Sequence, residues 1–166
     1  LEGEVAVRGV AKIPDARFLK LVEVFKPEKV TPASVPFVDI NARGEGAWSV
    51  IRQRIGSADA ILHVIDAFTD PDIAKLMDNY QKLSVEMAIA DLMMVEARLE
   101  KLMKIPVATL KPEEKMHREL LPRVKDVLES GGGVRDVEMS DSERDSLKSF
   151  SFLTIKPEMI VVNIAE

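Results

Sequence analysis

Ala60-Ile-Leu-His-Val-Ile-Asp-Ala-Phe68 is an almost continuous apolar run. Such a run fits a strand that is buried on both faces, as in a parallel sheet. A second apolar strand is predicted from Met159 to Ile164, directly after Lys156-Pro157. An apolar strand needs a strand partner, and the simplest pairing for this strand is with the first sheet. The order of elements therefore predicts an α/β fold whose strands are joined by crossover helices.

The region between these two strands has a helical pattern. From Asp72 to Lys104 there is no Gly or Pro, and the apolar residues follow a 4-3-4-3 spacing. This pattern predicts a long amphipathic helix with a coiled-coil-like seam. Around Val85 to Val95 the helix is apolar on more than one face. We therefore expect the middle of this helix to be buried against other elements.

Two further helices are predicted after the long one. Pro112, followed by two glutamates, starts the first of them, which runs to about Glu129 and stops at Gly131-Gly-Gly133. Pro122 lies inside that helix and predicts a kink or a break. Ser140 and Glu143 have the spacing of a capping box, which opens a short helix to about Phe150.

The first part of the chain consists of short apolar runs broken by Pro and Gly. Strands are predicted at Glu4–Val7 and Val35–Ile40, and helices at Arg17–Phe25 and Trp48–Ile55. Pro27 should end the first helix, because the residue before a proline is pushed out of the right-handed helical region. The resulting domain prediction is an α/β domain made of residues 1–71 and 151–166, with residues 72–150 forming a helical coiled-coil insertion.

Composition excludes several classes of function. The net charge of −5 gives no global attraction for nucleic acid. The absence of Cys excludes disulfides, cysteine-zinc sites and thiol catalysis, and is compatible with a reducing cytosol. No stretch approaches 18 uninterrupted apolar residues, which predicts no membrane-spanning helix. The first residues show no signal-peptide pattern and no Met, which indicates a start further upstream.

Three groups of residues are candidates for nucleotide chemistry. Asp39 ends an apolar strand, where a carboxylate either contacts Mg²⁺ at the edge of a parallel sheet or caps a turn. Gly44-Glu-Gly46 suits a loop near phosphates and equally suits a tight turn. Asn163 and Glu166 follow the last strand, where an amide and a carboxylate can bond the edge of a base. From the residues alone the structural interpretation is favoured for Asp39 and for the two glycines.

The remaining polar candidates are interpreted as structural. His63 lies within the apolar strand and is expected to be a satisfied core or sheet-edge histidine. His117 is on a charged helix and is expected at the surface, and the two distant histidines have no metal-ligand spacing. Asp66 could cap a turn or contact a loop near a nucleotide, and the structural role is favoured.

The ordered series of motifs resembles the Obg-related YchF family of P-loop NTPases. Lys26 to Ile40, with the sequence KPEKVTPASVPFVDI, is similar to the segment between the two switch regions of that family. Arg43-Gly-Glu-Gly46 resembles the end of the switch II loop, and Ala60 to Ala67 resembles the next strand. Met87 to Glu100 is similar to the helix that enters the coiled-coil insertion. Phe152 to Glu166 is similar to the return to the nucleotide domain.

This resemblance implies a Ras-like P-loop NTPase domain with an inserted helical hairpin. It implies a cytoplasmic protein with a ribosome-linked role, which binds and hydrolyses ATP or GTP with Mg²⁺. Asp39 would be the switch II aspartate that contacts Mg²⁺ indirectly, and Gly44 and Gly46 would belong to the switch II loop. Asn163 and Glu166 would contact the base. Ras-like GTPases have the motif N-K-x-D, whereas this chain has Glu166 at the acid position with Ala165 before it and lacks the Lys that stacks on the base, which weakens strict recognition of guanine.

Other features depart from the family pattern. No G-x-x-x-x-G-K-S/T motif occurs in the 166 residues, and Ala42 stands where switch II has Gly. The chain is therefore either an incomplete copy of a working NTPase, which we favour, or a degenerate scaffold. The first alternative predicts an ATP or GTP hydrolase whose catalytic residues we cannot name. The second predicts a non-catalytic module whose helical hairpin binds a ribosomal, protein or RNA partner.

Overall fold

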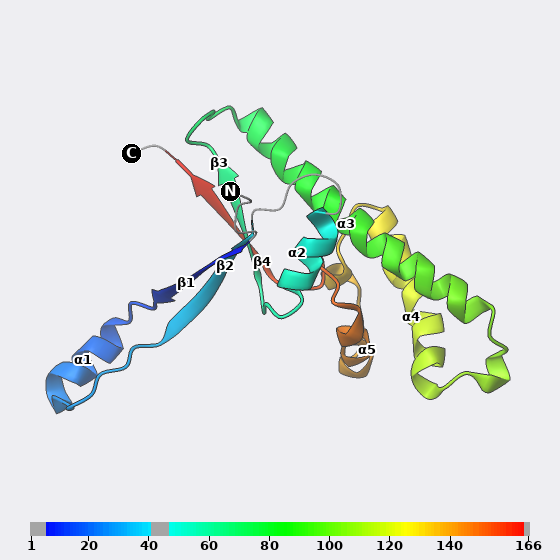
Figure 1. Ribbon diagram of the computed structural model, residues 1–166, viewed down its shortest axis with the longest axis horizontal. Helices are drawn as coiled ribbons and strands as arrows, with labels where there is room; N and C mark the ends of the chain where they lie inside the picture. The colour runs from blue at the N-terminus through cyan, green and yellow to red at the C-terminus, as the bar shows by residue number, and fades with distance from the viewer. Residues whose placement is uncertain (1–5, 41–46, 165–166) are drawn as a thin grey trace. The chain divides into compact units, whose positions relative to one another are not determined.

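The computed structural model describes residues 6–40 and 47–164. The chain forms two compact units, Leu1–Ala47 and Trp48–Glu166. The boundary between them lies at residues 47 and 48, whereas the predicted domain boundaries at residues 71 and 150 stay a prediction. Figure 1 gives the order of the elements along the chain.

The first unit is a two-stranded antiparallel sheet with a helix between its strands. Strand β1 (Ala6–Lys12) pairs with β2 (Ser34–Ile40), from Ala6 opposite Ile40 to Lys12 opposite Ser34. Helix α1 (Ala16–Phe25) begins where the carboxylate of Asp15 accepts a hydrogen bond from Arg17 N at 2.8 Å. It ends at Lys26, which adopts a left-handed conformation before Pro27, as the proline predicts.

The second unit contains a parallel pair of strands that are distant in sequence. Helix α2 (Ala47–Ile55) precedes β3 (Ile61–Asp66), which pairs with β4 (Glu158–Asn163). The register runs from Ile61 opposite Glu158 to Asp66 opposite Asn163. The last strand therefore pairs with the earlier apolar strand, as predicted.

The prediction that Ala60–Phe68 is covered on both faces is wrong for the described residues. Leu62 and Val64 are 42% and 58% exposed, whereas His63 between them is buried. Successive side chains of a strand point to opposite faces. One face of β3 packs toward α3, where the rings of His63 and Tyr80 lie 5.2 Å apart. The other face is open in the part of the chain that the structure describes.

A long helical hairpin separates β3 from β4. Helices α3 (Ile73–Met103) and α4 (Pro112–Glu129) lie side by side, joined through the short helix η1 (Val107–Thr109) (Figure 1). Lys125 of α4 donates a hydrogen bond to Glu96 of α3 at 2.8 Å. Pro122 does not break α4 into two helices. Buried side chains on both sides of the proline, Leu120, Leu121 and Val124, hold the helix in place.

Helix α4 ends in the glycine run, as predicted. Gly131 has a φ of 86°, a left-handed conformation that favours glycine. Gly132 N donates to Val127 O at 3.0 Å, which satisfies a carbonyl at the end of the helix. The short elements η2 (Val134–Asp136), α5 (Asp141–Ser146) and η3 (Leu147–Phe150) then return the chain to the sheet.

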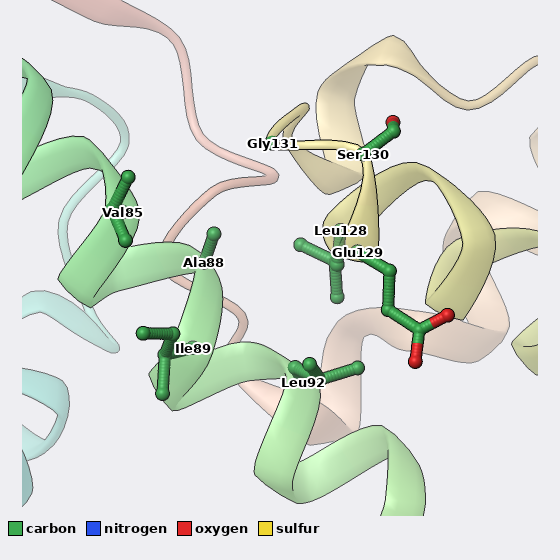
Figure 2. A pocket seen from close by; sticks show the side chains of 8 residues that line it. All are labelled: Val85, Ala88, Ile89, Leu92, Leu128, Glu129, Ser130 and Gly131. Carbon is green, nitrogen blue, oxygen red and sulfur yellow. The ribbon is translucent and has the colours of Figure 1, made fainter.

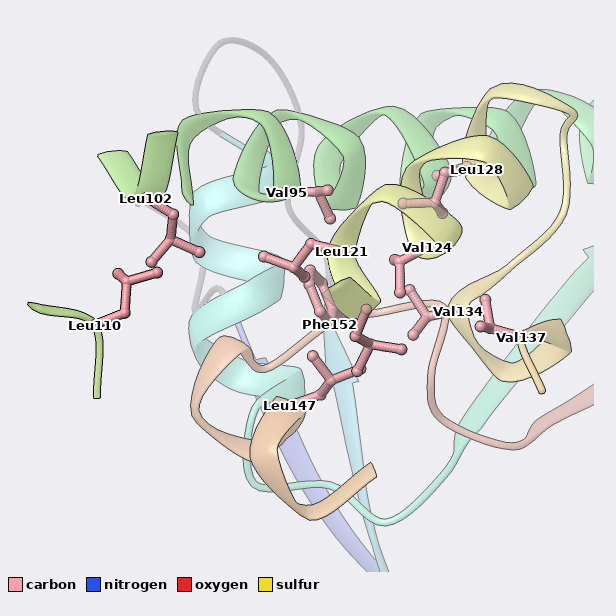
Figure 3. Packing of buried hydrophobic residues seen from close by; sticks show 12 residues of the cluster. Val95, Leu102, Leu110, Leu121, Val124, Leu128, Val134, Val137, Leu147 and Phe152 are labelled. Carbon is pink, nitrogen blue, oxygen red and sulfur yellow. The ribbon is translucent and has the colours of Figure 1, made fainter. Parts of the chain in front are cut away.

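One apolar core lies beneath the hairpin (Figure 3). Val95 and Leu102 from α3 meet Leu121 and Val124 from α4, and Phe152 joins them from the segment that leads to β4. All five side chains are fully buried. Burying each of them stabilises the fold by about 1.5–3 kcal/mol. The middle of α3 is therefore buried against other elements, as its sequence predicts.

Candidate functional site

The carboxyl ends of β3 and β4 bring two predicted residues to one edge of the sheet. Asp66 and Asn163 are opposite each other in the parallel register, and each is the last residue of its strand. Asn163 O accepts a hydrogen bond from Ala67 N at 2.9 Å, which extends the pairing past the strand end. The side chain of Asn163 is exposed. In open α/β sheets, ligands bind outside the carboxyl ends of parallel strands.

Asp66 shapes the turn that follows β3, as predicted. Its carboxylate accepts hydrogen bonds from Thr69 Oγ1 at 2.7 Å, Thr69 N at 3.3 Å and Phe68 N at 3.0 Å. These bonds, the one from the Thr69 hydroxyl first, hold the pKa of Asp66 below its usual range. Asp66 is thus an ionised turn cap that fixes the backbone beside Asn163.

Asp39 lies near the end of β2 in the first unit, and its side chain is exposed. The expectation of a parallel strand is wrong for the described pairing, because β2 runs antiparallel to β1, with Asp39 opposite Val7. The short apolar run Val35–Ile40 does not determine the direction of its partner strand. Gly44, Gly46 and Glu166 lie outside the described residues.

The described residues contain no group of three or more His, Cys, Asp or Glu side chains that could hold a metal ion. The predicted Mg²⁺ contact of Asp39 was an indirect one, for which a single exposed carboxylate is chemically suited. That contact stays a prediction.

The prediction for one of the two histidines is confirmed and that for the other is wrong. His63 is buried and donates from Nδ1 to Glu158 Oε1 at 3.0 Å, which confirms a satisfied histidine in the sheet. The prediction of a surface position for His117 is wrong, because this side chain is also buried. Its Nε2 donates to Ser146 O at 3.1 Å, and its ring meets the edge of Phe150 at 5.1 Å.

Sequence reasoning missed a buried carboxylate at the centre of α3. Asp91 is fully buried and accepts hydrogen bonds from Leu153 N, Thr154 N and Thr154 Oγ1 at 2.8–3.0 Å. Arg52 Nη2 of α2 lies 3.6 Å from its Oδ1. Burial raises the pKa of Asp91, while these hydrogen bonds and the guanidinium oppose that rise. Asp91 is the one charged residue in the run Met87 to Val95, a signal that could have identified it.

A groove lies between α3 and the C-terminal end of α4 (Figure 2). Val85, Ala88, Ile89 and Leu92 line it from α3. The other lining residues, Leu128, Glu129, Ser130 and Gly131, come from the end of α4 and the turn after it. None of the predicted nucleotide residues lines this groove, so it is separate from the edge at Asp66 and Asn163.

Among the residues that the structure describes, no helix is both long and apolar enough to cross a membrane.

No family model matches the chain. Individual relatives do match it over almost its whole length. The chain is 33% identical to the ribosome-binding ATPase YchF of Haemophilus influenzae, over 95% of this chain and 47% of that protein. It is 30% identical to the Bacillus subtilis protein of the same name, over 95% of this chain and 46% of that protein. It is 28% identical to the Obg-like ATPase 1 of Oryza sativa subsp. indica, over 93% of this chain and 42% of that protein.

A solved structure matches the fold. The Schizosaccharomyces pombe YchF GTPase superposes with a TM-score of 0.75 and 27% identity, over 96% of this chain and 47% of that one. The chain thus spans about half the length of the relatives it matches. The match confirms the predicted P-loop NTPase-like α/β fold with its long helical insertion. Sequence and structure together show that the chain belongs to the YchF family of Obg-related proteins.

Proposed function

We propose that this chain carries the base-binding part of a Mg²⁺-dependent ATP or GTP hydrolase. The observation that supports this most is the edge formed by β3 and β4, where Asn163 ends a parallel strand beside the turn that Asp66 caps. The exposed amide of Asn163 can both donate to and accept from the edge of a purine. The names of the relatives, ATPase in three cases and GTPase in one, support the same activity.

The remaining parts of the proposal follow the family resemblance. Asp39 would contact Mg²⁺ indirectly, and the ion would neutralise charge on the phosphates when bound. Gly44 and Gly46 would lie in the switch II loop, and Glu166 would contact the base. A ribosome-linked role in the cytoplasm would agree with relatives that are named ribosome-binding ATPases.

The test of the base contact is Asn163→Ala in the full-length gene product. Loss of the amide should weaken binding of ATP and GTP by about 10-fold, the usual effect of removing a hydrogen bond from a formed site. Isothermal titration calorimetry measures both affinities. Asn79→Ala is the matched control, because Asn79 is an exposed residue of α3. Unchanged affinity of Asn163→Ala for both nucleotides would remove this assignment.

The alternative function is a non-catalytic module that binds a ribosomal or RNA partner through the helical hairpin. Lys111 and Lys115 are exposed at the start of α4, on either side of Glu113 and Glu114, so that end of the hairpin offers two lysines for contact with phosphates. The double change Lys111→Glu and Lys115→Glu should therefore reduce co-sedimentation with ribosomes, since it reverses two charges that would face phosphates. Lys29→Glu, an exposed lysine of the first unit, is the control. Wild-type co-sedimentation of the double variant would count against this alternative.

A further inference from the structure

The first residue of β4 is a charged residue in a nearly buried position. The side chain of Glu158 is only 9% exposed. Its Oε1 accepts a hydrogen bond from His63 Nδ1 at 3.0 Å, and its Oε2 lies 3.3 Å from Arg135 Nη2. A buried carboxylate is costly unless it is paired and hydrogen-bonded. Glu158 is therefore held on two sides at once.

The two partners of Glu158 come from different parts of the second unit. His63 belongs to β3, and its ring lies against Tyr80 of α3. Arg135 belongs to η2, which follows the helical hairpin. Arg135 is itself fixed, because its backbone N and its Nε both donate to Thr154 O, at 3.1 and 3.0 Å. The contact thus connects the helical part of the chain to the start of β4.

The side chains in the rest of β4 contribute little to fixing the position of the strand. Only its first residue, Glu158, is nearly buried, and the next five residues are exposed in the structure described. The register of a strand is weakly specified when neither face is buried, and a slip by one residue turns every side chain to the opposite face. Such a slip would also move Asn163 by about 3.3 Å along the strand. Glu158 is the position at which burial and charge pairing oppose that slip.

We propose that Arg135, acting through Glu158, is a positioning residue for the purine base of a bound nucleoside triphosphate. Arg135 fixes the carboxylate of Glu158, Glu158 fixes the register of β4, and the register places Asn163 beside Asp66. Asn163 lies five positions after Glu158 along the strand, or about 16 Å, so Arg135 acts along the strand without touching the base. This inference rests on the proposed role of Asn163 in binding the base.

The chain offers a matched control for Arg135. Arg123 of α4 also pairs with a glutamate, because its Nη1 donates to Glu143 Oε1 at 2.9 Å. It also donates to a backbone carbonyl, that of Glu138. Both partners belong to the region between α4 and η3, and neither belongs to β4. Arg123→Gln therefore removes the same kinds of contact as Arg135→Gln without reaching the strand that carries Asn163.

The experiment measures the affinity of the full-length protein for ATP and GTP by calorimetry. Arg135→Gln should raise both dissociation constants about 3–10-fold, and Arg135→Lys, which keeps the charge toward Glu158, should restore most of the loss. Arg123→Gln should bind as the wild type does. Hydrogen exchange of residues 158–163 without nucleotide should be faster in Arg135→Gln only, because the register of β4 is then less well fixed.

The outcomes separate this inference from the proposed function. If Asn163→Ala weakens binding but Arg135→Gln does not, the positioning role is overturned and the base contact stands. If Arg123→Gln weakens binding as much as Arg135→Gln, the effect is general destabilisation and the positioning role is again overturned. If the wild-type protein binds neither nucleotide, the proposed function fails, and the base-positioning role fails with it.

Discussion

Asp91 connects three segments of the second unit through a single carboxylate. It belongs to α3, accepts hydrogen bonds from the backbone of Leu153 and Thr154, and faces Arg52 of α2. Thr154 extends the contact, because its Oγ1 accepts a hydrogen bond from Val134 N at 2.9 Å. The donors from Leu153 and Thr154 point at the carboxylate oxygens, so the position of Asp91 requires a hydrogen-bond acceptor.

Asp91→Asn should therefore destabilise the protein strongly. The new amide N–H groups would face the donors of Leu153 and Thr154, so buried donors would lose their acceptor. The substitution also removes the negative charge that faces Arg52. We expect a loss of about 2–5 kcal/mol in the free energy of unfolding. Urea denaturation followed by circular dichroism measures this loss. Asp126→Asn on the exposed face of α4 is the control, with an expected change within about 0.5 kcal/mol. A similar small change for Asp91→Asn would contradict this account.

The sequence contained signals for the buried polar residues, although their contacts depend on the fold. His117 precedes Leu121, Val124 and Leu128 at helical spacing, so it shares the buried stripe of α4. Charged neighbours in the sequence hid this stripe. The hydrogen-bond partner of His117 is 29 residues away in the sequence and those of Asp91 are 62 and 63 residues away, and only the folded chain brings them together. Asp66 was predicted correctly because its partners lie within three residues.

Among the elements, α5 shows how a short helix depends on its cap. It has only six residues, too few to be stable alone. Glu143 accepts hydrogen bonds from Ser140 N at 2.8 Å and Ser140 Oγ at 3.0 Å, while Ser140 Oγ accepts one from Glu143 N at 3.3 Å. This is the reciprocal capping box that the sequence predicts. Arg123 adds an ion pair to the same carboxylate.

The capping box predicts a pH dependence of stability. The hydrogen bonds from Ser140 and the charge of Arg123 lower the pKa of Glu143 from its usual value of 4.5. The folded state therefore binds this proton less tightly than the unfolded state does. The stabilisation is fully present above pH 4.5 and is lost as the pH falls through the lowered pKa. Glu143→Gln should reduce stability at pH 7.

Thermal denaturation at a series of pH values tests this prediction. The difference in melting temperature between wild type and Glu143→Gln should shrink as the pH falls from about 4.5 through the lowered pKa of Glu143, because protonation of Glu143 leaves both side chains uncharged. Glu119→Gln, an exposed glutamate of α4, provides the comparison. A difference that stays constant down to acidic pH would show that the charge of Glu143 contributes nothing to the cap.

The helices were easier to predict than the strands. Proline, glycine, capping residues and apolar spacing are local signals, and they located α1, α3, α4 and α5 closely. The apolar runs located β2, β3 and β4, but the antiparallel direction of β2 and the open face of β3 were not predicted. Strand β1 continues to Lys12, beyond the end predicted at Val7. A strand pairs with another strand elsewhere in the chain and packs against other elements. Its own residues do not show the direction of the paired strand or which face is covered.

At the scale of the whole molecule, the order of elements predicted the return of the chain to its first parallel strand. An apolar last strand needs a partner, and the parallel pairing of β3 with β4 confirms this argument. The edge that carries Asn163 follows from this pairing. The places of Gly44, Gly46 and Glu166 lie outside the described residues, so the predicted site is described only in part.

The pairing of two strands so far apart in sequence also has a consequence for synthesis of the protein. Strand β3 leaves the ribosome complete, yet its partner β4 is translated about 90 residues later, after roughly 5–20 s at usual elongation rates. During that interval the hairpin of α3 and α4 can fold from local contacts, which form quickly. Among the residues that the structure describes, β3 has no strand partner other than β4, so Leu62 and Val64 lie on an unpaired strand meanwhile, a state that favours aggregation. The nascent chain therefore depends on its helical insertion folding first and bringing β4 back to β3.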